Sequence, residues 1–244
     1  MPGFKKNVRC PLCGEKLAIM KEAVDMRCAV CGDAFYTDGL CKNKHYVCGG
    51  CQLERALEKI ASGCLNINSN DALAIGYELL MSRWIAVNGP EHHFLTAAAL
   101  LTAYHRRYSV DNIAGADIED ALREARSRTM KIPDGACGFW GCCGAAAAAG
   151  IFVSLVLKAM PSSGTERGAA NRVTAQALAR ISETGEPRCC KRETFTAIFT
   201  ASRFAEEQWG LPLTDYQGAE CHFYHLNDDC AKERCSFYSF YHQT

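Results

Sequence analysis

Paired cysteines crowd the first fifty residues of this chain, and they constrain its fold more than any other feature. Two Cys-x-x-Cys-Gly sequences place Cys10 with Cys13 and Cys28 with Cys31. A tight turn in such a sequence directs both thiolates at one ion, and the glycine that follows admits the turn geometry. Four thiolates satisfy one tetrahedral zinc ion. The sequence therefore predicts a metal-stapled module at the N-terminus.

A second group of ligands follows directly, with three thiolates and an imidazole from Cys41, His45, Cys48 and Cys51. Eight ligands are enough for two zinc ions and leave no open position for catalysis, so we expect structural sites. The four pairs can be wired sequentially, or crossed as in RING-like modules, where the pair with the histidine serves a different ion from the Cys-x-x-Cys after it. The spacing is compatible with both the sequential and the crossed pairing. A further alternative is iron bound by the first four thiolates.

Charge and cysteine usage exclude several classes of protein. The chain has 27 basic and 27 acidic side chains among 244 residues, so it lacks the broad basic field that holds nucleic acid or anionic membrane. Its longest apolar run, residues 145–157, is shorter than the about 20 residues that span a bilayer. No signal-peptide pattern opens the sequence, which favours a cytoplasmic protein. Sixteen cysteines in a reducing compartment indicate metal or thiol chemistry instead of disulfides.

Hydrophobic periodicity divides the chain into two units. The predicted fold is mainly α, with a small zinc-ribbon or RING-like β module at residues 1–52 and an α-helical, cysteine-rich domain at 53–244. In the module we expect strands at 16–20 and 23–28 around a turn. Helix signals, including Asn70 as a cap for the second helix, predict helices at 52–61, 71–82, 90–107, 117–131, 142–158, 165–182 and 192–209.

Two histidines open the most apolar of the predicted helices. His92 and His93 follow Gly-Pro-Glu and precede a segment that is apolar almost all round, which indicates a central helix. Adjacent side chains on a helix diverge by about 100°. At most one of the two histidines should therefore face a given site, while the other packs or caps; two purely structural histidines are the alternative.

Cysteines also stand at the starts of two predicted helices. Cys137 precedes the pair Cys142 and Cys143, and a second pair, Cys189 and Cys190, opens the last long helix. A helix N-terminus favours a thiolate. The alternative is that these are small buried core residues.

Three cations, Arg188, Lys191 and Arg192, flank the second cysteine pair, and they should depress thiol pKa values further. We expect one of each pair to join Cys137 and one histidine in a shared catalytic pocket, which would be an iron–sulfur or other metal site or a redox thiol pair.

The C-terminal segment adds three more cysteines. Cys221, Cys230 and Cys235 share this segment with His222 and His225, and their spacing is wider than that of a zinc knuckle. They are candidates for a cofactor-binding site of their own, or for completing the pocket above.

Several of these sequences together resemble the family called domain of unknown function 5714. The resemblance rests on the motifs around Cys41 to Cys51, Gly89 to His93, Cys137 to Ala145, Pro187 to Arg192, and Cys221 to Cys235. Lys44 stands where this family would have glycine, and Gly49 and Gly50 replace an acidic residue, but neither change removes a ligand. The family occurs in methanogens and anaerobic bacteria, sometimes beside or fused to SAM-dependent methyltransferases or radical SAM enzymes. The Cys143-Gly-Ala segment is also similar to redox proteins with a C-GCAxxG-C-C pattern.

Two hypotheses for function follow. The first is a zinc-containing metalloprotein that acts as a metal- or thiol-dependent catalyst of redox or group transfer on a small molecule in anaerobic metabolism. The second is a non-catalytic zinc-finger accessory protein for a methyltransferase or radical SAM partner. Nucleic-acid binding is not expected at neutral net charge.

Overall fold

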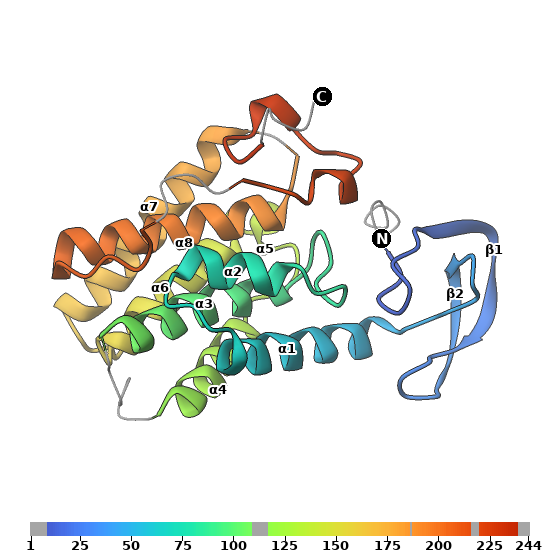
Figure 1. Cartoon of the computed structure of the whole chain (residues 1–244), viewed down its shortest axis with the longest axis horizontal. Coiled ribbons are helices and arrows are strands. Elements are labelled where there is room, and N and C mark those ends of the chain that lie inside the picture. The colour runs from blue at the N-terminus through green and yellow to red at the C-terminus, as the bar shows by residue number, and fades with distance from the viewer. Residues whose placement is uncertain (1–8, 109–116, 186, 216–219, 239–244) are drawn as a thin grey trace.

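The computed structural model describes residues 9–108, 117–185, 187–215 and 220–238. A β-ribbon and a helical domain account for these residues, and Figure 1 shows the ribbon projecting from one end of the helices. This arrangement confirms the predicted fold class. None of the helices in the described part of the chain combines the length and apolar character that crossing a membrane requires. The N-terminal residues 1–8, on which the predicted location partly rests, lie outside the described residues.

The ribbon consists of β1 (Leu17–Arg27) and β2 (Ala34–Cys41), which pair antiparallel. Their register shifts between Ile19 and Val24, so a bulge interrupts one continuous strand. The predicted turn inside residues 16–28 is therefore wrong. The reversal lies farther along, at the second knuckle, where Cys28 N donates to Asp33 O at 2.9 Å.

Helix α1 (Gly49–Asn66) joins the ribbon to the helical domain. Its N-cap is Cys48, whose sulfur accepts a hydrogen bond from Cys51 N, so the helix begins inside the metal-ligand sequence. The predicted unit boundary after residue 52 falls within this helix. Ala56, Leu57 and Ile60 are buried on its inner face, where it packs against α3.

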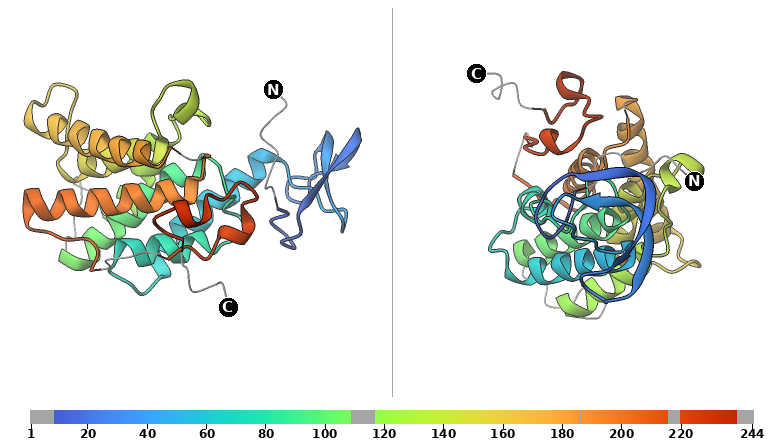
Figure 2. Two further views of the ribbon diagram at one scale, coloured as in Figure 1. Left: turned by 90° about the horizontal axis from the view of Figure 1, so that it is seen from above. Right: turned by 90° about the vertical axis from the view of Figure 1, so that its right-hand side faces the viewer.

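A central helix organises the domain. Helix α3 (Glu91–Tyr108) is buried from Glu91 through Ala103 and contacts five other helices. The remaining helices are α2 (Ala72–Leu80), α4 (Ile118–Thr129), α5 (Ala136–Phe139), α6 (Gly144–Val156), α7 (Thr165–Thr184) and α8 (Cys190–Trp209). Figure 2 shows α7 and α8 running alongside each other over the core. All but the short α5 overlap predicted helices.

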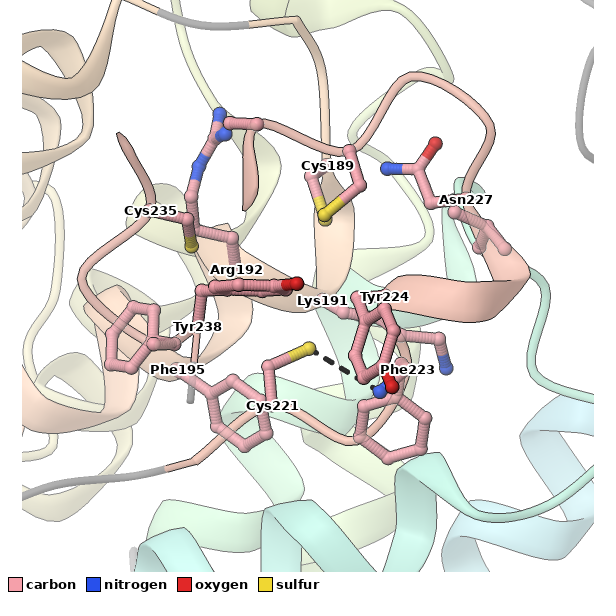
Figure 3. A pocket seen from close by; sticks show the side chains of 14 residues that line it. Cys189, Lys191, Arg192, Phe195, Cys221, Phe223, Tyr224, Asn227, Cys235 and Tyr238 are labelled. Atoms are coloured by element: carbon pink, nitrogen blue, oxygen red, sulfur yellow. Dashed lines mark hydrogen bonds between the residues drawn. The ribbon is translucent and has the colours of Figure 1, made fainter. Parts of the chain in front are cut away.

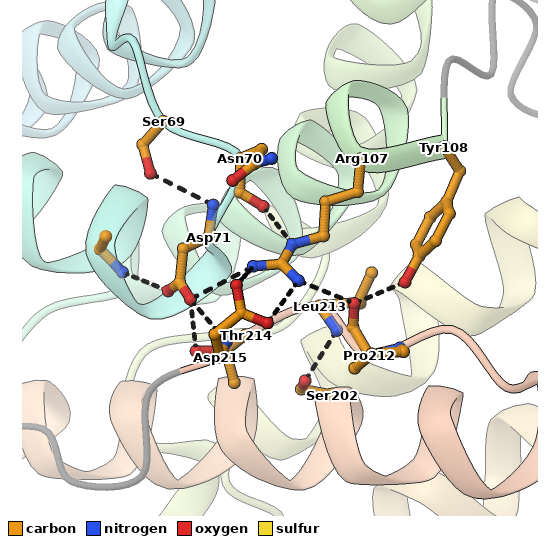
Figure 4. A network of polar contacts seen from close by, with 11 residues as sticks. Ser69, Asn70, Asp71, Arg107, Tyr108, Ser202, Pro212, Leu213, Thr214 and Asp215 are labelled. Carbon is orange, nitrogen blue, oxygen red and sulfur yellow. Dashed lines mark hydrogen bonds and ion pairs between the residues drawn. The ribbon is translucent and has the colours of Figure 1, made fainter.

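A polar network fastens the chain after α8 to the start of α2 (Figure 4). Asp71, not the predicted Asn70, caps α2: its Oδ1 accepts from Ala74 N at 2.9 Å, and its Oδ2 accepts from Thr214 Oγ1 at 2.7 Å. Arg107 donates to both carboxylate oxygens of Asp215 at 2.9 and 2.6 Å. The segment that carries the last three cysteines is therefore anchored where it leaves α8.

Candidate functional site

The eight ligands of the N-terminal module form two groups, and the ligand atoms within each group lie within 4.8 Å of one another. One group contains Cys10, Cys13, Cys41 and His45, and the other contains Cys28, Cys31, Cys48 and Cys51. The wiring is crossed. Iron on the first four thiolates is excluded, because those four belong to two different groups.

The ribbon produces this crossed arrangement. Leu17 pairs with Cys41 in the sheet, which brings Cys41 back beside the first knuckle. At the other end of the ribbon, Ala29 N donates to Tyr46 O at 2.8 Å and holds the second knuckle near the chain that continues to Cys48. The ribbon therefore holds the two knuckles apart, and each knuckle meets the ligands that lie at its own end of the ribbon.

Sulfur and nitrogen atoms in the first group are close enough for one tetrahedral ion. Cys13 Sγ lies 3.3 Å from Cys41 Sγ, and Cys10 Sγ lies 3.7 Å from His45 Nδ1. A zinc ion about 2.3 Å from each sulfur places its ligand atoms about 3.8 Å apart. The backbone N–H of Glu15 is the main cause that lowers the pKa of Cys13 to about 6, so its thiolate is favoured at neutral pH. Both groups of four can hold a metal ion.

A second assembly of cysteines lies between the start of α8 and the α5–α6 region, and we call it the thiol pocket. It brings Cys137, Cys143 and Cys190 together with both histidines of α3. Cys142 does not line it. The lining residues are His92, His93, Gly135, Ala136, Cys137, Cys143, Gly144, Ala145, Arg188, Cys190 and Glu193.

The two histidines of the thiol pocket differ in their hydrogen bonds. His92 has both ring nitrogens occupied, with Thr194 Oγ1 at 3.2 Å from Nδ1 and Ala86 O at 3.0 Å from Nε2. The buried Nδ1 of His93 has no hydrogen-bond partner among the described residues. Burial lowers the pKa of His93 to about 4, so its ring is neutral at pH 7. His93 is thus the histidine with a nitrogen free for chemistry.

Burial, and not the helix start, decides the charge of the thiols. It raises the pKa of Cys143 to about 12, helped by the nearby Glu193 carboxylate. Burial also raises the pKa of Cys190, although the adjacent Arg188 opposes the shift. The expectation that helix starts and cations would gather thiolates here is wrong, because desolvation outweighs both effects. Cys143 and Cys190 are uncharged thiols at neutral pH.

Glu193 was not anticipated from the sequence. Its Oε2 accepts the S–H of Cys143 at 3.4 Å, while Oε1 lies 3.5 Å from Cys189 N and 3.6 Å from the guanidinium of Arg192. Its side chain is only 9% exposed, so this carboxylate is held inside the domain beside a thiol. The sequence feature that could have identified Glu193 is its position in the first turn of a helix that begins with cysteines.

Gly144 matters for the same pocket because the ring of His93 packs directly on its backbone. A Cβ at Gly144 would lie only 2.1 Å from His93 Nε2. Only glycine leaves room for the histidine at this position.

The remaining cysteine of the α8 pair points elsewhere. Cys189 lines a different pocket together with Cys221, Cys230 and Cys235, and we call this the four-cysteine pocket. The three C-terminal cysteines therefore do not complete the thiol pocket; they meet the neighbour of one of its cysteines. Figure 3 shows the side chains of Cys189, Cys221 and Cys235 on different sides of the four-cysteine pocket.

Residues 60–238 match a family model described as a family of unknown function, DUF5714. The chain belongs to this family. The resemblance noted in the sequence is thereby confirmed. The DUF5714 match contains every cysteine of the thiol pocket and the four-cysteine pocket, whereas the eight ligands of the module precede it. No curated protein and no solved structure matches the chain.

Proposed function

We propose that this DUF5714 chain is a cytoplasmic zinc metalloprotein whose helical domain is a thiol-dependent catalyst of redox or group transfer on a small molecule. The observation that carries the proposal is the convergence of Cys137, Cys143 and Cys190 with His93 on one small pocket. Zinc is the metal proposed for the module, because closed thiolate and imidazole sets are typical of structural zinc.

Thiol chemistry suits the thiol pocket better than a single metal ion does. Within the described ranges, groups of three or more potential ligand atoms inside 4.8 Å occur only in the N-terminal module. The sulfurs and the imidazole of the thiol pocket are therefore too widely spaced to share one ion. We therefore propose thiol-dependent catalysis at the thiol pocket, without a single shared metal ion.

The proton of the Cys143 thiol leaves as the sulfur attacks, because this buried thiol has a pKa of about 12 and does not ionise beforehand at neutral pH. Glu193 Oε2 accepts the S–H of Cys143 and can take this proton as general base, leaving the electron pair on sulfur. In group transfer, the sulfur bonds to an electrophilic atom of the substrate, and the leaving group departs with the electrons of the broken bond. The neutral imidazole of His93 lines the same pocket and can hydrogen-bond to the substrate.

Redox chemistry in the same pocket needs two thiols. Cys143 and Cys190 would form a disulfide, release two protons and pass two electrons to an oxidised small-molecule substrate. Three cysteines in one pocket make such a dithiol reaction feasible, whereas group transfer requires only one.

Untargeted metabolite conversion tests the proposal. The full chain, purified anaerobically with its zinc, is incubated with a small-molecule extract of an anaerobic microbe, and mass spectrometry follows which compounds change. We expect conversion by the wild type and by the matched control Cys142→Ser, and its loss in Cys143→Ser; Cys190→Ser should lose conversion only if the reaction is the dithiol redox form. Wild-type conversion by a folded Cys143→Ser variant would contradict the proposal.

The accessory hypothesis is supported by a different observation. Ile19 and Tyr36 on the projecting ribbon are 60% and 75% exposed, so the ribbon presents apolar side chains that a partner would cover. A SAM-dependent methyltransferase or radical SAM enzyme would be the partner. This hypothesis predicts that conversion occurs only after the partner is added, and that Tyr36→Asp abolishes co-purification with it while the zinc content is unchanged.

A further inference from the structure

We propose that the four-cysteine pocket binds a [4Fe–4S] cluster, with one cysteine ligand on each iron. The proposal does not depend on the catalytic role of the thiol pocket. It rests on the placement of the cysteines, on backbone hydrogen bonds to their sulfurs, on the spacing of those sulfurs, and on a buried cation beside them.

Two distant segments supply the four cysteines. Cys189 is the N-cap of α8, and the other three lie in the C-terminal segment around the short 3-10 helices η1 (Tyr224–Leu226) and η2 (Lys232–Arg234). All four line one pocket whose walls include five aromatic side chains (Figure 3). An irregular segment gains little from packing its cysteines together as free thiols, whereas a shared cofactor would fix its path.

The backbone around the C-terminal cysteines repeats the hydrogen bonding of the metal-binding module. Phe223 N donates to Cys221 Sγ, and Lys232 N donates to Cys230 Sγ, both at 3.4 Å and both from two residues ahead. In the module, Asn43 N donates to Cys41 Sγ at 3.4 Å with the same spacing. Such N–H groups stabilise a thiolate, and hydrogen bonds to sulfur are one of the means by which proteins tune iron–sulfur clusters. These cysteines have the backbone geometry of ligands.

The spacing of its sulfurs distinguishes the four-cysteine pocket from a site for a single zinc ion. Over the residues that the structure describes, only the two groups in the module bring three or more ligand atoms within 4.8 Å. One ion would require sulfurs about 3.8 Å apart. A cluster with one cysteine on each of its irons spreads its ligands more widely, and iron–sulfur clusters take four cysteine thiolates.

A buried cation supplies an independent indication that an anion occupies this pocket. Lys191 is 2% exposed, its Nζ donates to Leu80 O at 3.2 Å, and the same atom lies 4.4 Å from the centroid of the Phe223 ring. No carboxylate of the described chain lies within ion-pair distance of it, although the buried Glu91 carboxylate acts on it electrostatically at longer range. A buried ammonium is costly unless a negative charge compensates it. A cluster held by four thiolates carries net negative charge, and Arg192, which also pairs with Glu193 at 3.6 Å, lines the same pocket.

Cluster content tests the proposal directly. The full chain is purified anaerobically, reconstituted with ferrous iron and sulfide, and analysed for iron, acid-labile sulfide and zinc, with electron paramagnetic resonance after reduction by dithionite. We expect about four irons and four sulfides per chain, in addition to zinc. The Cys189→Ala variant should lose most of the iron and the resonance signal, whereas the matched control Cys142→Ala, outside both pockets, should retain them.

Helical circular dichroism shows whether the helical domain of each variant is folded. Zinc content shows whether the N-terminal module is folded, because the zinc ligands lie in that separate module. Absence of iron and sulfide from the folded, reconstituted wild type would overturn the proposal, as would full iron content in Cys189→Ala. Two irons and two sulfides would overturn the four-iron assignment. None of these outcomes depends on metabolite conversion at the thiol pocket.

Discussion

Cys189 and Cys190 are neighbours in the sequence, yet their side chains line different pockets. Cys189 has an extended backbone, with φ of −141° and ψ of 95°, and Cys190 is the first residue of α8. The change from extended to helical backbone turns the two thiols apart. One peptide unit therefore connects the four-cysteine pocket to the thiol pocket, and substitutions at the two positions should have separable effects.

Loss of one zinc ligand should unfold the module while the helical domain remains folded. We predict that Cys41→Ser removes one of about two zinc ions and exposes the ribbon to limited proteolysis, because the binding energy of a structural zinc is folding energy. Lys42→Ala is the matched control, since that side chain is 66% exposed and pairs with Glu15. Full zinc content with unchanged proteolysis in Cys41→Ser would show that Cys41 is not a ligand.

A methyl group at Gly144 should displace His93. We predict that Gly144→Ala destabilises the protein by about 1–3 kcal/mol, as overpacking of a filled core does, because the added Cβ would meet the imidazole at 2.1 Å. Gly138→Ala is the control, since a Cβ there has no neighbour within 4 Å. Denaturant unfolding measures both, and equal stability of the two variants would contradict this packing.

The two carboxylates that face Arg107 should contribute unequally. Asp71→Ala removes a helix cap and an acceptor for Thr214, and should cost about 2 kcal/mol. Asp215→Ala removes a carboxylate whose side chain is 79% exposed, so it should cost less than about 1 kcal/mol despite its two short contacts to Arg107. Thermal unfolding of both variants gives the ranking, and the reverse order would refute it.

Acid should destabilise the helical domain partly through His92. Burial lowers its pKa well below 6.5, so the unfolded chain binds a proton that the folded chain does not. Above the pKa of the unfolded chain, His92 is neutral in both states and does not destabilise the fold. As the pH drops below about 6.5, proton binding by the unfolded chain progressively lowers the free energy of unfolding. His92→Gln should therefore make the pH dependence of unfolding shallower between about pH 6.5 and 5. Identical slopes for both proteins would show that His92 is not buried as a neutral ring.

The sequence predicts features that depend on local pattern. Hydrophobic periodicity and turn residues place the long helices, and Cys-x-x-Cys spacing identifies both knuckles of the module. The cap of α2 shows the limit of such reasoning: Asn70 and Asp71 are both good caps, and tertiary contacts of Asp71 with Thr214 favour the second.

Features that depend on chain path or on burial are not local. Crossed wiring follows from the pairing of Leu17 with Cys41 across the ribbon, which no spacing rule contains. The protonated state of Cys143 follows from its burial in the folded domain, and this reverses the effect expected from a helix start. Likewise, the meeting of Cys189 with Cys221 requires two segments that are distant in the sequence.

Anomalous diffraction at the iron edge, from anaerobic crystals of the reconstituted full chain, tests most directly the separation of the two adjacent cysteines into two sites. We expect iron bonded to Cys189 and to the three C-terminal cysteines, with no metal bonded to Cys190. Iron bonded to Cys190, or a reconstituted four-cysteine pocket without iron, would contradict this expectation.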